Sequence, residues 1–129
     1  MVVELDTYEK RLLETWEEVY KKGQLTFWML LSLKKHGRSM FDMKKFIQSA
    51  TNELIVADDK SMYRALRRLV LMDLVSYDEQ KAVGKGPATK VYTLTENGIN
   101  VLSAFIERNI TGLLFKPEIK SLLLEEKHG

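Results

Sequence analysis

The chain has 129 residues, of which 45% are hydrophobic, and its 20 basic and 18 acidic side chains give a formal net charge of +2. This length and composition predict one folded domain with an appended element and argue against a disordered chain. The sequence contains no cysteine, which excludes disulfides, thiolate metal sites and cysteine nucleophiles. The apolar runs are too short to span a membrane and no secretory leader is visible, so we expect a cytoplasmic protein.

Basic side chains are concentrated in one part of the chain. Residues 60–90 carry seven basic and three acidic side chains, whereas residues 1–22 carry four basic and six acidic ones. A local positive excess on a nearly neutral protein is typical of a surface that contacts phosphate groups. The distribution therefore directs attention to residues 60–90 as a nucleic-acid interface.

The first predicted element is an amphipathic helix from Leu5 to Lys22. Its apolar residues recur at spacings of three and four, and charged residues occupy the other side. Such a face packs either on its own domain or on a second copy of the chain, and its large apolar area favours the second copy. The expected dimer contacts are Leu5, Tyr8, Leu12, Trp16, Val19 and Tyr20.

Two further helices follow a turn at Gly23. The stretch Gln24 to Lys35 is apolar nearly all round, which predicts a buried helix. The next helix begins after a cap at Ser39 and closes near residue 52. Lys44 and Lys45 point outward from it.

The stretch Asp58 to Met72 forms a helix with two unlike faces when it is read at 100° per residue. Asp59 or Ser61 is the expected cap of its first turn. Tyr63 falls with the apolar residues, which favours a core position over a DNA contact. The opposite side gathers four basic residues: Lys60, Arg64, Arg67 and Arg68. We interpret this stretch as a DNA-recognition helix.

A change of period after this helix predicts a two-stranded hairpin. Leu74 to Tyr77 forms a short strand, and Lys90 to Thr95 alternates apolar and polar residues as a half-buried strand does. Residues 78–89 are rich in turn residues. Because no helix follows Gly84-Lys85-Gly86, this segment is interpreted as a wing turn and not as a phosphate loop. The basic residues of the hairpin are Lys81, Lys85 and Lys90.

Two helices complete the predicted chain. Thr95 caps a helix that fades near Asn109, and the chain then bends around Gly112. Pro117 suits the first turn of a last helix over Glu118 to Lys127. This helix is expected to add Leu122 and Leu123 to a dimer interface.

Helix, helix, helix, hairpin and helix in this order predict a winged helix-turn-helix, which is mainly α with a small β-hairpin wing. Three helices make a small core, the hairpin covers one open side, and the third helix stays exposed along one face. We expect a dimerisation helix at 1–22, a DNA-binding domain at 23–109 and a second dimerisation element at 110–129.

Several segments resemble the PadR family of transcriptional regulators. Ser61 to Leu69 followed by Asp73-Leu74-Val75 is similar to the family's recognition helix and first wing strand. Val91 to Gly98 is similar to the segment that closes the wing and opens the next helix, and Gly23 to Leu33 resembles an early helix. The resemblance covers roughly residues 23–108. It implies a homodimer that binds a palindromic operator, usually as a repressor, through contacts between terminal helices.

The expected partner is double-stranded DNA, contacted from three places. The recognition helix would supply major-groove contacts from Lys60, Ser61, Arg64, Arg67 and Arg68. The wing would supply backbone or minor-groove contacts from Lys81, Lys85 and Lys90. Lys44 and Lys45 either touch phosphate or are only solvated, and Arg68 could pair with an acid instead.

Other functions fit the sequence less well. A winged helix that binds protein would more often carry apolar or mixed residues in place of the arginines at 64, 67 and 68. We expect no enzyme, metal site or cofactor, because the chain has two histidines and no cysteine. The aromatic residues Trp16, Tyr20, Phe27 and Trp28 either pack in the core or line a pocket for a small apolar effector.

Overall fold

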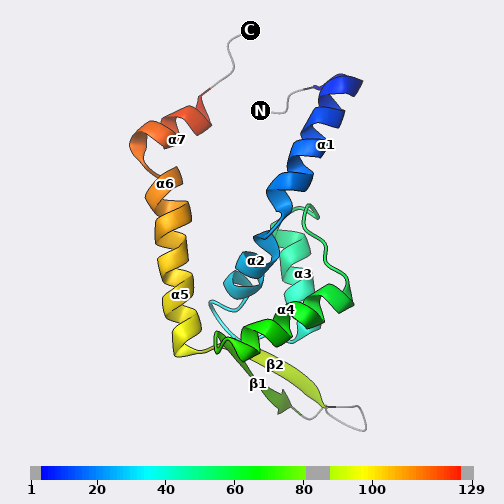
Figure 1. Cartoon of the computed structure of the whole chain (residues 1–129), viewed down its shortest axis with the longest axis vertical. Coiled ribbons are helices and arrows are strands. Elements are labelled where there is room, and N and C mark those ends of the chain that lie inside the picture. The colour runs from blue at the N-terminus through cyan, green and yellow to red at the C-terminus, as the bar shows by residue number, and fades with distance from the viewer. Residues whose placement is uncertain (1–3, 81–87, 126–129) are drawn as a thin grey trace.

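The computed structural model describes residues 4–80 and 88–125 and has the element order that the sequence predicts (Figure 1). Four helices precede the wing: α1 (Thr7–Lys21), α2 (Gln24–Ser32), α3 (Met40–Ala50) and α4 (Asp59–Leu71). The wing consists of β1 (Val75–Gln80) and β2 (Thr89–Leu94). The chain then continues through α5 (Glu96–Ile106), a π-helical turn η1 (Glu107–Thr111), α6 (Gly112–Leu114) and α7 (Pro117–Leu124).

The core lies between α2, α3, α4, α5 and the wing, and the fold is the predicted winged helix. Met29, Met43 and Met62 are completely buried, one on each of α2, α3 and α4. Burial of unbranched, flexible side chains at this junction fills the irregular space where helices cross. The other buried apolar residues are Leu30, Leu33, Ile47, Ala65, Leu66, Leu69, Leu74, Val75, Tyr92 and Leu102.

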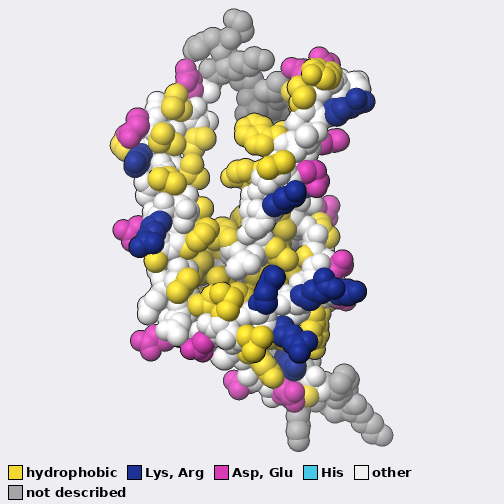
Figure 2. Space-filling view, viewed as in Figure 1, with side chains coloured by type: hydrophobic (Ala, Val, Ile, Leu, Met, Phe, Trp, Pro, Cys, Tyr) yellow, Lys and Arg dark blue, Asp and Glu magenta, His cyan; other side chains and the backbone are white. Residues whose placement is uncertain are grey.

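Two arms leave this body, and both run away from the wing (Figure 1). One arm is α1, and the other is the helical run α5–η1–α6 with α7 at its end. Neither α1 nor α7 contains a buried residue. In Figure 2 the upper parts of the arms are separated by open space, and hydrophobic side chains line the sides that face each other. The arms therefore present apolar surface that this protomer alone does not cover.

The wing is an antiparallel hairpin in which Val75 pairs with Leu94 and Gln80 with Thr89. The first strand is longer than the predicted Leu74 to Tyr77. A third segment joins the second strand, because the backbone N–H of Arg38 donates to the carbonyl of Tyr92 at 3.0 Å and the N–H of Tyr92 donates back at 2.8 Å. This isolated bridge, which the sequence did not reveal, ties the entry of α3 to the wing.

The junction between the wing and α5 is tightly packed around Gly98. A Cβ atom at this position would lie 2.0 Å from the carbonyl oxygen of Leu74, so only glycine fits. Thr95 caps α5 as predicted, because its hydroxyl accepts the N–H of Gly98 at 3.0 Å. The same hydroxyl donates to the carbonyl of Asp73 at 2.6 Å. These contacts hold the end of the wing against the start of the arm.

The structure corrects two local predictions beyond the wing. The bend expected around Gly112 is wrong, because the chain stays helical from α5 to Leu114 through the π-helical turn. The N–H of Gly112 reaches back five residues to the carbonyl of Glu107, and a Cβ there would lie 2.1 Å from that oxygen. The last helix begins at Pro117 and ends at Leu124, whereas the predicted bounds were Glu118 and Lys127.

No helix within the described residues is long and apolar enough to cross a membrane.

Candidate nucleic-acid interface

The helix α4 has the two faces that the sequence predicts. Met62, Ala65, Leu66 and Leu69 are buried against the core. Since successive residues are turned by about 100°, the residues opposite this face point away from the protein. All four predicted basic residues of this helix are exposed, and Figure 2 shows dark blue side chains gathered over α4. Lys60, Arg64 and Arg67 border one shallow hollow on this surface.

The first turn of α4 is held by acids, and its cap differs from the prediction. The N-cap is Asp58, not Asp59 or Ser61, because the Asp58 carboxylate accepts the backbone N–H of Ser61 at 2.7 Å. Hydrogen bonds from the backbone and side chain of Ser61 lower the pKa of Asp58 below its ordinary value of 3.8. Ser61 is exposed at this turn, where its backbone serves the cap.

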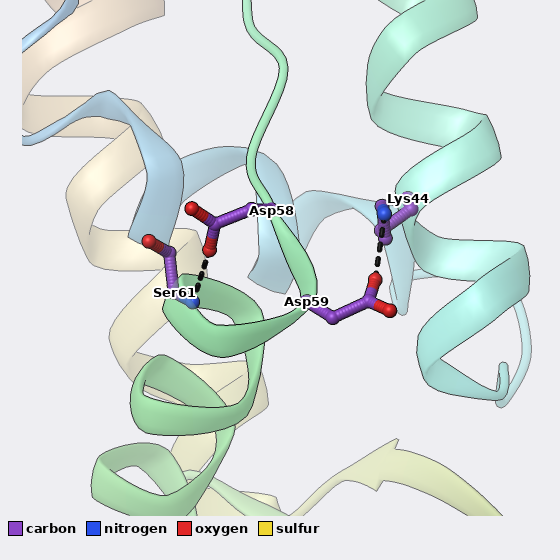
Figure 3. A network of polar contacts seen from close by, with 4 residues as sticks. All are labelled: Lys44, Asp58, Asp59 and Ser61. Carbon is purple, nitrogen blue, oxygen red and sulfur yellow. Dashed lines mark hydrogen bonds and ion pairs between the residues drawn. The ribbon is translucent and has the colours of Figure 1, made fainter.

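Lys44 is not a free cation in this structure. Its ammonium lies 2.7 Å from Oδ1 of Asp59, which joins α3 to the start of α4 (Figure 3). The Lys44 side chain is 25% exposed and the Asp59 side chain 74%. Asp58 and Asp59 thus point in different directions, one into the cap and the other toward α3 (Figure 3). Lys45 is exposed, with its ammonium 5.3 Å from the ring centre of Phe41.

Tyr63 is not the core anchor that the sequence favoured. It is 54% exposed and borders the same hollow as Lys60, Arg64 and Arg67. It follows the buried Met62 by one residue, which turns it about 100° away from the core. Its ring therefore stands at the border of the basic face, on the side of the wing.

The wing places one predicted basic residue beside α4. Lys90 is half-buried, and its ammonium lies 4.6 Å from the ring centre of Tyr77. Together with Tyr63 and Arg67 these two residues border a groove between α4 and the hairpin. Burial raises the pKa of Tyr92, the wing residue beneath this groove. Lys81 and Lys85, the other two predicted wing contacts, lie outside the described residues.

A separate pocket of about 260 Å³ lies where the α1 arm meets the body. Tyr20 and Trp28 border it, together with four residues between α3 and α4: Thr51, Asn52, Leu54 and Ile55. Gln24 fixes both aromatic residues, since its amide accepts from Nε1 of Trp28 at 3.3 Å and donates to the Tyr20 carbonyl at 2.7 Å. Trp16 is not among the residues that line this pocket, and Phe27 packs on Phe105 with ring centres 5.5 Å apart.

Several solved protein structures share this fold. PadR of Bacillus subtilis, solved in complex with operator DNA, shares 22% identity at a TM-score of 0.58, over 64% of this chain and 47% of that one. This chain therefore spans about half the length of that protein.

Two other solved structures match over nearly their whole length. A PadR-like transcription factor from Bacteroides fragilis shares 25% identity at a TM-score of 0.59, over 79% of this chain and 99% of that one. A PadR family transcriptional regulator from Eggerthella lenta DSM 2243 shares 19% identity at a TM-score of 0.65, over 94% of this chain and 100% of that one. No curated protein matches the sequence. A family model described as the transcriptional regulator PadR-like family matches residues 29–104, more than half of the sequence, so the chain belongs to the PadR-like family of transcriptional regulators.

Proposed function

We propose that the protein is a sequence-specific repressor that binds a palindromic DNA operator as a homodimer in the cytoplasm. The observation that carries this proposal is the exposed line of Lys60, Arg64 and Arg67 on the outer side of α4. Cations on the exposed face of a helix in this fold suit a major groove, where some reach phosphates and arginine pairs best with guanine. The Bacillus subtilis relative, whose structure contains operator DNA, supports the same use.

The wing would contact the DNA beside the major groove. Lys90 stands next to α4 and would reach the backbone, while Lys81 and Lys85 are proposed contacts in the part of the hairpin beyond the described residues. Ser61, Arg68 and Lys45 are exposed and remain proposed contacts, with Lys45 the candidate for phosphate. Lys44 is not included among these proposed DNA contacts, because its ammonium is paired with the Asp59 carboxylate.

Dimerisation would use both arms. Apolar residues at helical spacing that the protomer itself leaves uncovered are suited to an isologous contact with a second copy. A two-fold dimer would then hold its two recognition helices about 34 Å apart, one turn of DNA. Residues 1–22 and 110–129 would be the dimerisation elements, and residues 23–109 the DNA-binding domain. The exposed members of this surface are Tyr8, Leu12, Trp16, Val19 and Tyr20 on α1 and Leu122 and Leu123 on α7, while Leu5 is partly covered.

Selection of bound sequences from random duplex DNA tests the proposal. The expected result is a two-fold symmetric site with half-sites one turn apart, bound less tightly as salt rises. Enrichment of no sequence, together with binding that ignores salt, would overturn the proposal and favour a winged helix that binds protein. A reporter assay with the selected site then distinguishes repression from activation.

The pocket between the α1 arm and the body favours one addition to this function, a small apolar effector. Ligand bound between Tyr20 and Trp28 would touch both the arm and the loop that leads to α4, and so would link the dimer contact to the recognition helix. The Trp16→Phe variant leaves Trp28 as the only tryptophan, since the chain has two. Titration with an apolar cation and with a phenolic acid should quench its fluorescence, and no response to either class would reject this site.

A further inference from the structure

The exposed face of α4 contains one residue that a purely electrostatic contact with DNA does not explain. Asp59 borders the same hollow as Lys60, Tyr63, Arg64 and Arg67. A carboxylate on a surface that approaches phosphates is repelled by them, so it weakens nonspecific binding. Its neighbour Asp58 has a structural use as the helix cap, whereas α4 would keep its cap without Asp59.

The position of the Asp59 carboxylate is fixed from α3. Oδ1 accepts from the Lys44 ammonium at 2.7 Å, and no described residue donates to Oδ2. The lysine is three-quarters covered while the acid is three-quarters exposed. The lysine therefore holds the acid and offsets its charge, and the acid keeps a free acceptor oxygen at the start of the recognition helix.

We propose that Asp59 reads an exocyclic amino group in the major groove and that Lys44 is a positioning residue for it. This inference rests on the proposed function, in which the exposed side of α4 enters that groove. The amino donors presented there are N4 of cytosine and N6 of adenine, and carboxylates pair with the first. In this proposal Lys44 does not contact a phosphate. It contributes to base selection indirectly, by holding the Asp59 carboxylate in position.

The test is selection from random duplex DNA with the full-length protein and its Asp59→Ala variant. The native protein should prefer a C·G base pair over the other pairs at one position of each half-site, by about 10-fold in affinity, because cytosine N4 is the amino group with which carboxylates pair. Asp59→Ala should lose the preference at that position and keep the rest of the pattern.

Asp58→Asn is the matched control. It removes an acid from the same end of the same helix, and asparagine keeps the N-cap, so the base pattern should be unchanged. Lys44→Ala should weaken the preference at the Asp59 position, and Lys44→Arg should restore it. A lysine that serves stability alone would change the melting temperature and leave the base pattern intact.

Two results would overturn the inference. Asp59→Ala could keep the full base pattern, or it could raise affinity for every duplex by the same factor as Asp58→Asn, which would mean that the acid acts only through its charge. Failure of the proposed function is distinguishable, because Arg64→Ala with Arg67→Ala would then leave duplex binding unchanged. If that double substitution abolishes binding while Asp59→Ala changes nothing, only the assignment of Asp59 is wrong.

Discussion

Replacing Arg64 and Arg67 by alanine perturbs the proposed DNA interface with little cost to the fold. Both side chains are exposed on the outer side of α4, opposite the buried Met62 and Leu66. Surface substitutions of this kind change the free energy of unfolding by about 0.5 kcal/mol or less. Helicity and dimerisation should therefore stay the same, and any loss of binding can be assigned to the interface.

The expected effect follows from counterion release. Each phosphate contact contributes about 0.9 to the slope of log affinity against log salt concentration. A dimer in which one of the two arginines contacts phosphate in each protomer would lose about 1.8 from that slope, and one in which both do would lose about 3.6. Over a fourfold change in salt the slope difference alone corresponds to about 10- to 150-fold in affinity. If either arginine also pairs with a base, its removal weakens the sequence preference as well.

The assay is fluorescence anisotropy of a labelled operator duplex and of an unrelated duplex, between about 50 and 200 mM salt. A double variant of Arg11 and Arg108 removes the same charge from exposed sites on the two arms, outside α4 and the wing. It should leave the slope unchanged. Equal slopes and equal affinities for the native protein and the variant at 64 and 67 would refute the recognition-helix assignment.

Three further variants test other parts of the molecule. Gly98→Ala should destabilise the fold by about 1–3 kcal/mol in urea unfolding, because its Cβ meets the Leu74 carbonyl oxygen; an alanine that stabilises, as in an ordinary helix, would contradict this packing. Replacing Leu12 and Trp16 by glutamate should give monomers in sedimentation, and persistent dimers would shift the interface to the C-terminal arm. Asp58 has a lowered pKa when folded, so its stabilisation is present above about pH 4 and is lost as pH falls through the folded value. In Asp58→Asn the melting temperature should decline less steeply with acid.

Much of the fold could be predicted because the spacing of apolar residues along a helix indicates which side of that helix packs against another element. The 100° period in α4 separates Met62, Leu66 and Leu69 from the basic residues, and burial in the structure follows the same division. Thr95 is followed at N3 by the glycine whose N–H it accepts. The capping hydrogen bond of α5 thus joins residues only three positions apart, so it can be predicted from the local sequence.

The sequence led to wrong predictions where it allowed two local structures equally well. Asp58 and Asp59 are adjacent acids, and either can cap a helix, so periodicity does not fix the start of α4 to one residue. Gly112 is a turn signal in most contexts. Here it permits a π-helical turn instead, because only a residue without Cβ can approach the Glu107 carbonyl this closely.

The candidate site was harder to predict than the fold because its neighbours come from other elements. The ion pair between Lys44 and Asp59 joins residues 15 positions apart in the chain. The position of Lys90 over the Tyr77 ring depends on the register of the hairpin. The spacing of residues within a single helix or strand does not predict these contacts, because each of them joins two different elements.

The residues at the border of the exposed face of α4 should add to the specificity of the proposed DNA contact. The centre of that face carries cations, which attract every duplex to a similar extent where they contact phosphates and select a base only where an arginine pairs with guanine. Asp59 and Tyr63 stand at the border, where α3 and the wing adjoin the helix. In the proposed complex, an acid that repels phosphates and an exposed aromatic ring would each favour DNA sequences in which a base offers the matching group. A winged helix with the same exposed face of α4 but without the lysine of α3 should therefore lose part of its selectivity.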